Sequence, residues 1–402
     1  MNSTRISFAV GASALALMSA AYAAPAKKTA PAAASTPPIA TYWMDVSTVS
    51  GMGMGMMGGG RPDMASMMSM MNGGGASASH TLNLRLASRT PAPGAPRAEH
   101  LIPASLGMGQ SLPLVTPQRS APERGDMGSY QPRGRMLIYW GCGDHVAAGQ
   151  PLTFDFAQIA SGKVPENIRK LSEMMARRGI TGRSGPTSAP GFGEWPNRED
   201  GRAVPPGGSL LGAHRVQANY SPPIAFSLGA GQDFMAPMRM SEAGAGLVRW
   251  APVPGATGYA LAMFGSSGNG DVIMWNSARS ASFAALDYLS PGEVARAITA
   301  GSALPPSTTE CMIPAEVTRA VPAGMVMGVA YGPELHFADA PRNPKWAVTV
   351  RYKSNATLMH GMGGGMGAGM SNDDQSASED QQPKKKKRRG LGDLLGGAIP
   401  HP

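Results

Sequence analysis

The sequence predicts a mostly β protein made of two antiparallel β-sandwich-like domains, with short helices, long disordered loops and a disordered tail. The chain has 402 residues, which is enough for two domains. It contains 53 Gly and 36 Pro, and aromatic residues make up only 6%, a composition typical of many turns and long connections. Short runs of β-branched and aromatic residues alternate with these turn residues, which favours strands over helices.

The N-terminus has the pattern of a secretory signal peptide. Arg5 precedes an apolar run over 6–18, and Ala21-Tyr22-Ala23 supplies the small residues of a cleavage site. We expect cleavage after Ala23 and a location in the periplasm or outside the cell. An uncleaved N-terminal anchor is the alternative, although the run is short for a helix that spans a bilayer of about 30 Å. We expect no transmembrane segment in the mature chain.

The first part of the mature chain predicts an expanded hairpin. Residues 24–38 are rich in Ala and Pro and predict a disordered linker. Residues 40–46 have the β-branched and aromatic content of a strand, and 81–86 alternate strictly between polar and apolar. The Met/Gly-rich segment 51–75 lies between these two strands and would form the loop of the hairpin.

A second hairpin and a helix follow. Residues 135–140 and 152–156 flank a glycine-rich turn and predict paired strands. The apolar period of 164–178 predicts a helix, with Pro165 in its first turn. Two further strands, at 216–220 and 224–228, would complete the first domain.

The second predicted domain has clearer signals for the starts and ends of its elements. Ser290-Pro291-Gly292-Glu293 is a capping box with proline at the first helical position, so it predicts a short helix that ends at Gly301. The remaining elements are predicted strands at 247–250, 259–264, 272–275, 325–331, 335–338 and 346–352.

Residues 248–259, Val-Arg-Trp-Ala-Pro-Val-Pro-Gly-Ala-Thr-Gly-Tyr, carry a family resemblance. They resemble the hairpin between strands B and C of fibronectin type III domains, and 321–326 is similar to that family's turn into strand F. The resemblance implies a β-sandwich in which Trp250 and Tyr259 pack across the two sheets. The whole chain also resembles exported proteins of Gram-negative bacteria, a resemblance that carries no activity with it.

These segments predict one division of the chain. It comprises a signal peptide at 1–23, a disordered linker at 24–38, a β-rich domain at 39–235 with the Met/Gly-rich loop 51–75, a fibronectin type III-like domain at 236–355, and a disordered Met/Gly-rich and polybasic tail at 356–402.

Two clusters of methionine suggest a metal site. Thioethers are soft ligands that select Cu(I), and closely spaced ligands on a flexible glycine backbone can converge on one ion. A sticky partner-binding loop and a low-complexity tract without function are the alternatives. The candidate ligands are Met52, Met54, Met56, Met57, Met64, Met67, Met68, Met70, Met71, His360 and Met362, with Met359, Met366 and Met370 in the same second cluster.

The only two cysteines are Cys142 and Cys311. In an oxidising compartment they can form a disulfide, or both can remain buried thiols. Cys142 also lies near Asp144 and His145, so a metal site or an enzyme with Cys142 as nucleophile and His145 as base is a lesser alternative. We predict no other catalytic residue.

The net charge of +9 is concentrated in one run. Six adjacent cations near the C-terminus account for all but three of these charges, so we expect no nucleic-acid partner. Such a run suits an anionic envelope lipid, and a merely solvated tail is the alternative. The leading hypothesis is therefore a non-enzymatic envelope adaptor without a cofactor, which binds an anionic surface or an unidentified envelope protein. Its surface-binding residues would be Lys384, Lys385, Lys386, Lys387, Arg388 and Arg389.

Overall fold

The computed structural model of the chain describes residues 36–51, 78–118, 134–160, 166, 169, 185–244, 246–281 and 286–361. Over these ranges the protein is mostly β, as predicted, with one large mixed sheet and two smaller antiparallel sheets. Each helix in these ranges is too short or too polar to cross a membrane.

The large sheet has nine strands. Four antiparallel strands occupy its middle, two more extend one edge, and three extend the other. In spatial order the strands are β6 (Leu152–Asp155), β5 (Arg135–Trp140), β13 (Val272–Asn276), β12 (Gly258–Ser266), β15 (Gly324–Ala338), β16 (Trp346–His360), β1 (Ala40–Gly51), β2 (Ser79–Ser88) and β7 (Gly191–Trp195).

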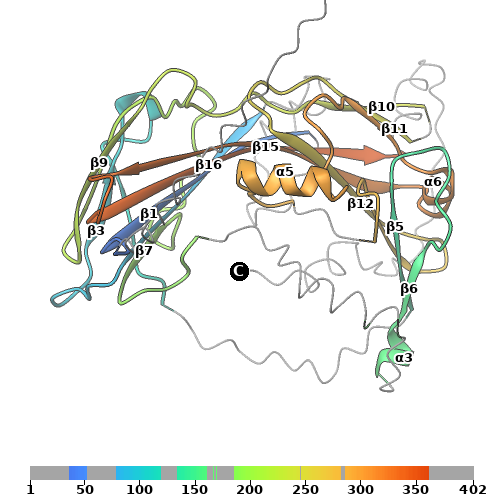
Figure 1. Cartoon of the computed structure of the whole chain (residues 1–402), viewed down its shortest axis with the longest axis horizontal. Helices are drawn as coiled ribbons and strands as arrows, with labels where there is room; N and C mark the ends of the chain where they lie inside the picture. The colour runs from blue at the N-terminus through green and yellow to red at the C-terminus, as the bar shows by residue number, and fades with distance from the viewer. Residues whose placement is uncertain are drawn as a thin grey trace, which may run out of the picture.

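This sheet corrects the predicted division at 235/236, because it takes strands from both predicted domains. β1 pairs in parallel with β16 over its whole length, and β5 pairs in parallel with β13. Figure 1 shows the long β15–β16 hairpin crossing the molecule, with β1 alongside it. The physical reason is that β13 and β16 would otherwise expose unpaired edges, which strands from the first half of the chain cover.

The two predicted hairpins are confirmed. β1 pairs antiparallel with β2, and β5 pairs antiparallel with β6. The helix expected over 164–178 lies largely outside the described residues, as do the signal peptide and most of the linker.

Both smaller sheets cover the same face of the large sheet. One consists of β10 (Met240–Ala243), β11 (Leu247–Trp250) and β14 (Glu310–Met312). The other consists of β4 (Ser111–Pro113), β3 (Ala98–Leu101), β8 (Gly212–Ala218) and β9 (Ser221–Leu228). Period-2 alternation buries the even-numbered side chains of β1 and β16 against them, including Tyr42, Met44 and Val350.

The helices are short. α5 (Pro291–Thr299) lies on the opposite face of the large sheet, where Val294 packs against Val329 and Tyr331 (Figure 1). Its predicted capping box is confirmed: Ser290 accepts from the Glu293 backbone, and the Glu293 carboxylate accepts from the Ser290 backbone. The other helices in the described ranges are α3 (Phe156–Ala160), α6 (Ala315–Ala320) and the 3-10 turn η1 (Ala104–Leu106).

The last two strands are longer than predicted. β15 runs unbroken from Gly324 to Ala338, with one register shift between Tyr331 and Glu334, where two strands were expected. β16 continues to His360, so the predicted start of the tail at 356 is wrong. Its extra residues pair with β15 and, as far as Thr357, also with β1, and these ladders satisfy backbone groups that a tail would leave unpaired.

A chain of buried polar groups lies under β1. The Leu210 carbonyl can only accept, so His214 Nε2 donates to it at 2.7 Å. In a neutral ring His214 Nδ1 must then accept from His100 Nε2, at 3.0 Å. His100 Nδ1 in turn accepts from the Tyr42 hydroxyl at 2.9 Å. All three of these hydrogen bonds can therefore form only while both histidines are neutral.

This series of buried hydrogen bonds predicts that the protein is less stable at acidic pH. Burial lowers the pKa of His100 and of His214, and the proximity of His214 lowers that of His100 further. The unfolded chain binds more protons, so stability is fully present above about pH 6.5 and is lost as the pH falls below it. Urea unfolding at pH 7.5 and 5.5 should show a loss of up to about 1.4 kcal/mol per pH unit for each histidine.

The controls separate these two histidines from others. The triple variant Tyr42→Phe/His100→Leu/His214→Leu removes the side-chain donors and acceptors of this hydrogen-bonded series. It should remove the part of the pH dependence that His100 and His214 cause and leave the contribution of His80, whose pKa is also lowered by burial. His336→Ala removes a histidine whose side chain is 62% exposed and should leave the loss unchanged. A triple variant as acid-sensitive as the wild type would contradict this account.

Candidate functional site

The strand end where β1 and β16 both stop is the candidate functional site. Parallel strands have their C-terminal ends at the same end of a sheet, and here Gly51 pairs with Thr357. The first methionine-rich stretch follows Gly51 in sequence, and the second begins at Met359 and continues past Gly361. β1 and β16 pair although they are some 300 residues apart in sequence, so the two methionine-rich stretches are attached to neighbouring residues at this end of the sheet.

Glycine is required at both points of departure. Gly51 has φ +90°, and a Cβ there would lie 1.9 Å from the Thr357 carbonyl oxygen. Gly361 has φ +80°, and a Cβ there would lie 2.0 Å from the Pro322 carbonyl oxygen. Only glycine fits such a left-handed, closely packed backbone, so both positions are fixed by the fold.

His360, the last residue of β16, is buried at this strand end and is held by a carboxylate. Its Nδ1 lies 2.7 Å from Glu242 Oε1, on β10. The same oxygen of Glu242 accepts from the Gly246 backbone at 2.8 Å, which fixes the carboxylate. When Nδ1–H donates to Glu242, the neutral ring has its lone pair on Nε2. No other hydrogen bond to this ring occurs within the described part of the chain.

Thioethers occupy the other face of the same strand end. Met325 of β15 is the direct antiparallel partner of Met359 of β16, and Met327 follows two residues later on the same face. All three side chains are half-buried. Side chains paired in this way have Cβ atoms about 4.5–5.5 Å apart, so the sulfurs of Met325 and Met359 can approach one another.

Most of the predicted copper ligands lie outside the described residues. This applies to Met362 and to the whole first cluster, so their arrangement stays a prediction. His360 was expected in the tail and instead belongs to β16. Among the residues that the structure describes, no group of three or more His, Cys, Asp or Glu could hold a metal ion.

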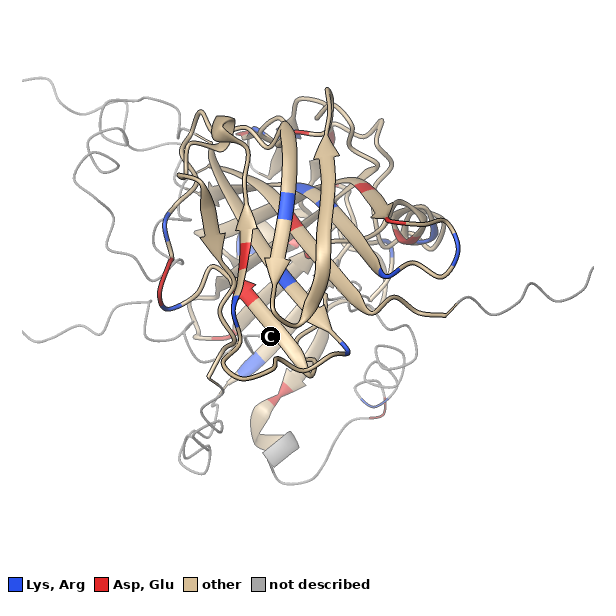
Figure 2. Ribbon diagram, turned by 90° about the vertical axis from the view of Figure 1, so that its left-hand side faces the viewer, with Lys and Arg blue, Asp and Glu red and all other residues tan. Residues whose placement is uncertain are grey.

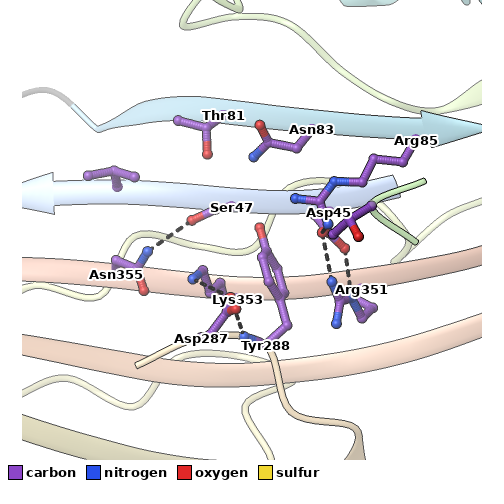
Figure 3. A pocket seen from close by; sticks show the side chains of 12 residues that line it. Asp45, Ser47, Thr81, Asn83, Arg85, Asp287, Tyr288, Arg351, Lys353 and Asn355 are labelled. Carbon is purple, nitrogen blue, oxygen red and sulfur yellow. Dashed lines mark hydrogen bonds and ion pairs between the residues drawn. The ribbon is translucent and has the colours of Figure 1, made fainter. Parts of the chain in front are cut away.

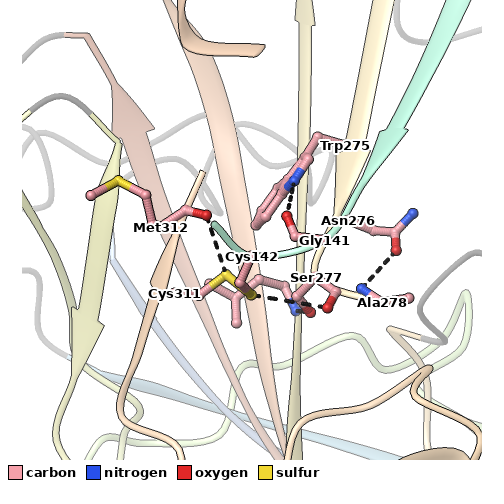
Figure 4. Close-up of a disulfide and its surroundings, with 9 residues drawn as sticks. Gly141, Cys142, Trp275, Asn276, Ser277, Ala278, Cys311 and Met312 are labelled. Carbon is pink, nitrogen blue, oxygen red and sulfur yellow. Dashed lines mark hydrogen bonds between the residues drawn. A yellow bond between two sulfur atoms is a disulfide. The ribbon is translucent and has the colours of Figure 1, made fainter. Parts of the chain in front are cut away.

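The cysteines form a disulfide, with Cα atoms 5.2 Å apart (Figure 4). Gly143 donates to the Met312 carbonyl at 2.9 Å beside it, and Ala315 donates to the Asp144 carbonyl at 3.0 Å. The bond joins the turn after β5 to the β14–α6 segment.

The residues near Cys142 therefore have structural partners. His145 Nδ1 lies 3.0 Å from Glu316 Oε1, which attaches the same turn to α6. Because the sulfur of Cys142 is bonded to that of Cys311, it cannot act as a thiolate nucleophile or metal ligand.

The polybasic run at 384–389 lies outside the described residues, and its binding to anionic lipid stays a prediction. In the part of the chain that the structure describes, Figure 2 shows Lys and Arg close to Asp and Glu on neighbouring strands, so that positive and negative residues are mixed. Five of these charges surround a polar cavity between β1, β2 and β16.

Comparison with known proteins gives no relative: no family model, no curated protein and no solved structure matches the chain.

Sequence reasoning missed both Glu242 as a partner of His360 and the polar cavity. Alternation in 44–47 and 348–353 was a usable signal, because polar side chains recur there at every second position. No local pattern indicates that these two segments lie side by side.

Proposed function

We propose that the protein is an exported, non-enzymatic Cu(I)-binding protein that uses its two methionine-rich stretches and His360. The observation that carries this proposal is the parallel pairing of β1 with β16, which ends with Gly51 opposite Thr357. It tethers both methionine-rich stretches to one end of the sheet, beside the His360–Glu242 pair.

The ligand chemistry favours Cu(I) over harder ions. Thioethers bind soft ions, and imidazole binds copper as well. Nine methionines follow Gly51 within 52–71, and further methionines follow Gly361. A chain so rich in glycine can bring several of them to one ion without strain.

The Glu242 carboxylate supports the role of His360. Histidines that bind metals usually donate their other ring N–H to a carboxylate or carbonyl, which fixes the tautomer and raises the basicity of the ligating nitrogen. His360 has this arrangement, with Glu242 in turn fixed by the Gly246 backbone.

The proposed scaffold is a fibronectin type III-like sandwich with added edge strands. In support, β10, β11 and β14 form a three-stranded sheet, while β13, β12, β15 and β16 are consecutive in the large sheet. Trp250 and Tyr259 contact one another between these layers, with ring centroids 5.4 Å apart. In this proposal the sandwich displays the methionine-rich stretches rather than catalysing a reaction.

The proposed export agrees with the disulfide between Cys142 and Cys311, because such bonds persist mainly in oxidising compartments. The disulfide also removes thiolates as competing copper ligands, so binding must use thioethers and imidazole.

Glu242→Gln is the sharpest test. It keeps the shape of the side chain but replaces a charged acceptor of the His360 N–H. Loss of such a supporting partner typically weakens metal binding about 10- to 100-fold, and we expect that loss of Cu(I) affinity, measured by competition with a chromophoric chelator in ascorbate. Replacing 52–77 with Asn-Gly should reduce the number of bound Cu(I) ions.

His336 and Glu334 provide a matched control. They form a similar histidine–carboxylate pair, 2.9 Å apart, toward the opposite end of the same hairpin. His336→Ala should leave Cu(I) affinity unchanged. The proposal is wrong if the wild type binds no Cu(I), or if Glu242→Gln and the loop replacement both bind as tightly and as much as the wild type.

A further inference from the structure

A polar cavity of about 250 Å³ opens on the face of the large sheet that the smaller sheets do not cover (Figure 3). β1, β2 and β16 form its floor, and the segment before α5 forms a wall. Its lining residues are Asp45, Ser47, Val49, Thr81, Asn83, Arg85, Thr187, Asp287, Tyr288, Arg351, Lys353 and Asn355.

Strand register explains why so many polar groups meet there. Asp45 is opposite Arg351 on one side and Asn83 on the other, and Ser47 is opposite Lys353. Alternation directs each of them to the same face, opposite the apolar core.

One cation and one carboxylate in the cavity form a bidentate ion pair. Arg351 Nε and one of its terminal nitrogens each donate to a different oxygen of Asp45, both at 2.7 Å. The guanidinium also lies between the rings of Trp43 and Tyr288, 4.8 Å from each centroid. This pair forms the rigid base of the cavity.

The positive charge of Arg85 is only weakly balanced by a carboxylate. Its nearest carboxylate oxygen is Asp45 Oδ2, at 3.8 Å, and that oxygen already accepts from Arg351. The side chain of Arg85 is one-quarter exposed and can turn toward a bound group.

Lys353 is a second cation whose charge is only weakly balanced by neighbouring groups. Its Nζ donates to the Leu286 carbonyl at 3.2 Å and lies 3.4 Å from Asp287 Oδ1, whose side chain is mostly exposed. It also lies 4.3 Å from the centroid of the Tyr288 ring. Burial lowers the pKa of Lys353, and the nearby carboxylate of Asp287 opposes this shift.

Neutral hydrogen-bonding groups fill the rest of the floor. Asn355 donates from its side-chain amide to the Ser47 hydroxyl at 3.2 Å (Figure 3). The side-chain amide of Asn83 makes no hydrogen bond within the described part of the chain, and Thr81 is exposed beside it. Amides and hydroxyls arranged in this way suit the hydroxyl groups of a ligand.

We propose that this cavity binds a small hydroxylated carboxylate, such as a sugar acid, with its carboxylate on Arg85 and Lys353. The three cations Arg85, Arg351 and Lys353 face the two carboxylates of Asp45 and Asp287, which leaves one positive charge. A monoanion neutralises that charge, whereas a dianionic phosphate ester overcompensates it and a neutral sugar leaves it unpaired. The site is independent of the proposed copper site.

The test measures binding of D-glucuronate, D-glucose and D-glucose 6-phosphate to the full chain at pH 7.5. Calorimetry gives the affinity, and the change in total tryptophan fluorescence, to which Trp43 close to Arg351 contributes, reports occupancy. We expect D-glucuronate to bind most tightly. Arg85→Gln should weaken it about tenfold, because the variant loses a charged hydrogen-bond donor.

Asn83→Leu keeps every charge and tests the hydroxyl contacts, so it should also weaken D-glucuronate. Arg249→Gln is the control, because Arg249 forms an exposed pair with Glu310 away from the cavity. Thermal melts confirm that each variant folds. The proposal is overturned if the wild type does not bind D-glucuronate, if D-glucose binds equally well, or if Arg85→Gln and Asn83→Leu bind it as the wild type does.

Discussion

Replacing Cys142 and Cys311 together with alanine should lower the free energy of unfolding by about 5 kcal/mol. The two residues are 169 positions apart in sequence, so the bond closes a very long loop. The unfolded chain regains the entropy of that loop when the bond is lost, and this cost grows with the logarithm of loop length. The effect comes mainly from the unfolded state.

Urea unfolding of the wild type, the single variants and the double variant measures this effect. Each single variant should be about as unstable as the double variant, because either change breaks the same bond. The wild type in a strong thiol reductant should match them. Identical unfolding midpoints with and without reductant would contradict the account of the disulfide.

Asp45→Asn should lower the free energy of unfolding by about 3–5 kcal/mol, the usual cost of removing one partner of a buried ion pair. The side chains of Asp45 and Arg351 are each only 5% exposed. The variant leaves the guanidinium of Arg351 buried without its anion. Urea unfolding at low and at high salt measures the loss, which should depend little on salt because the pair is shielded from solvent.

The double variant Asp45→Leu/Arg351→Met separates pairing from burial. It removes both charges and replaces them with apolar side chains, so it should recover much of the stability that Asp45→Asn loses. If Asp45→Asn unfolds at the wild-type midpoint, the pair contributes no stability to the sheet.

The elements that the sequence predicted correctly are those defined by local signals. The capping box at Ser290 defined the start of α5, and alternation in 81–86 defined β2. The Pro/Gly turn between Trp250 and Tyr259 separated β11 from β12. Each of these signals acts within a few residues, where steric and hydrogen-bonding preferences decide the backbone.

The pairing of distant strands could not be predicted in the same way. β1 and β16 are about 300 residues apart, and both read as half-buried strands that would suit several neighbours. Period-2 alternation fixes which face is buried but does not identify the partner strand. The division into two domains was wrong for this reason.

The candidate site combines both cases. The methionine clusters are evident from composition, whereas their common tether depends on the β1–β16 register. The sequence predicts a last strand that ends at Tyr352, which places His360 in the tail. Pairing with β15 makes 353–360 strand, and it brings His360 to Glu242.

X-ray absorption at the copper edge of Cu(I)-loaded protein, prepared in ascorbate with the disulfide intact, tests the proposed function most directly. Since both cysteines form the disulfide, sulfur ligands must be thioethers. We expect mainly sulfur scattering with one lighter ligand, and loss of that lighter ligand in His360→Ala. Copper surrounded only by nitrogen and oxygen, or no retained copper, would contradict the proposal.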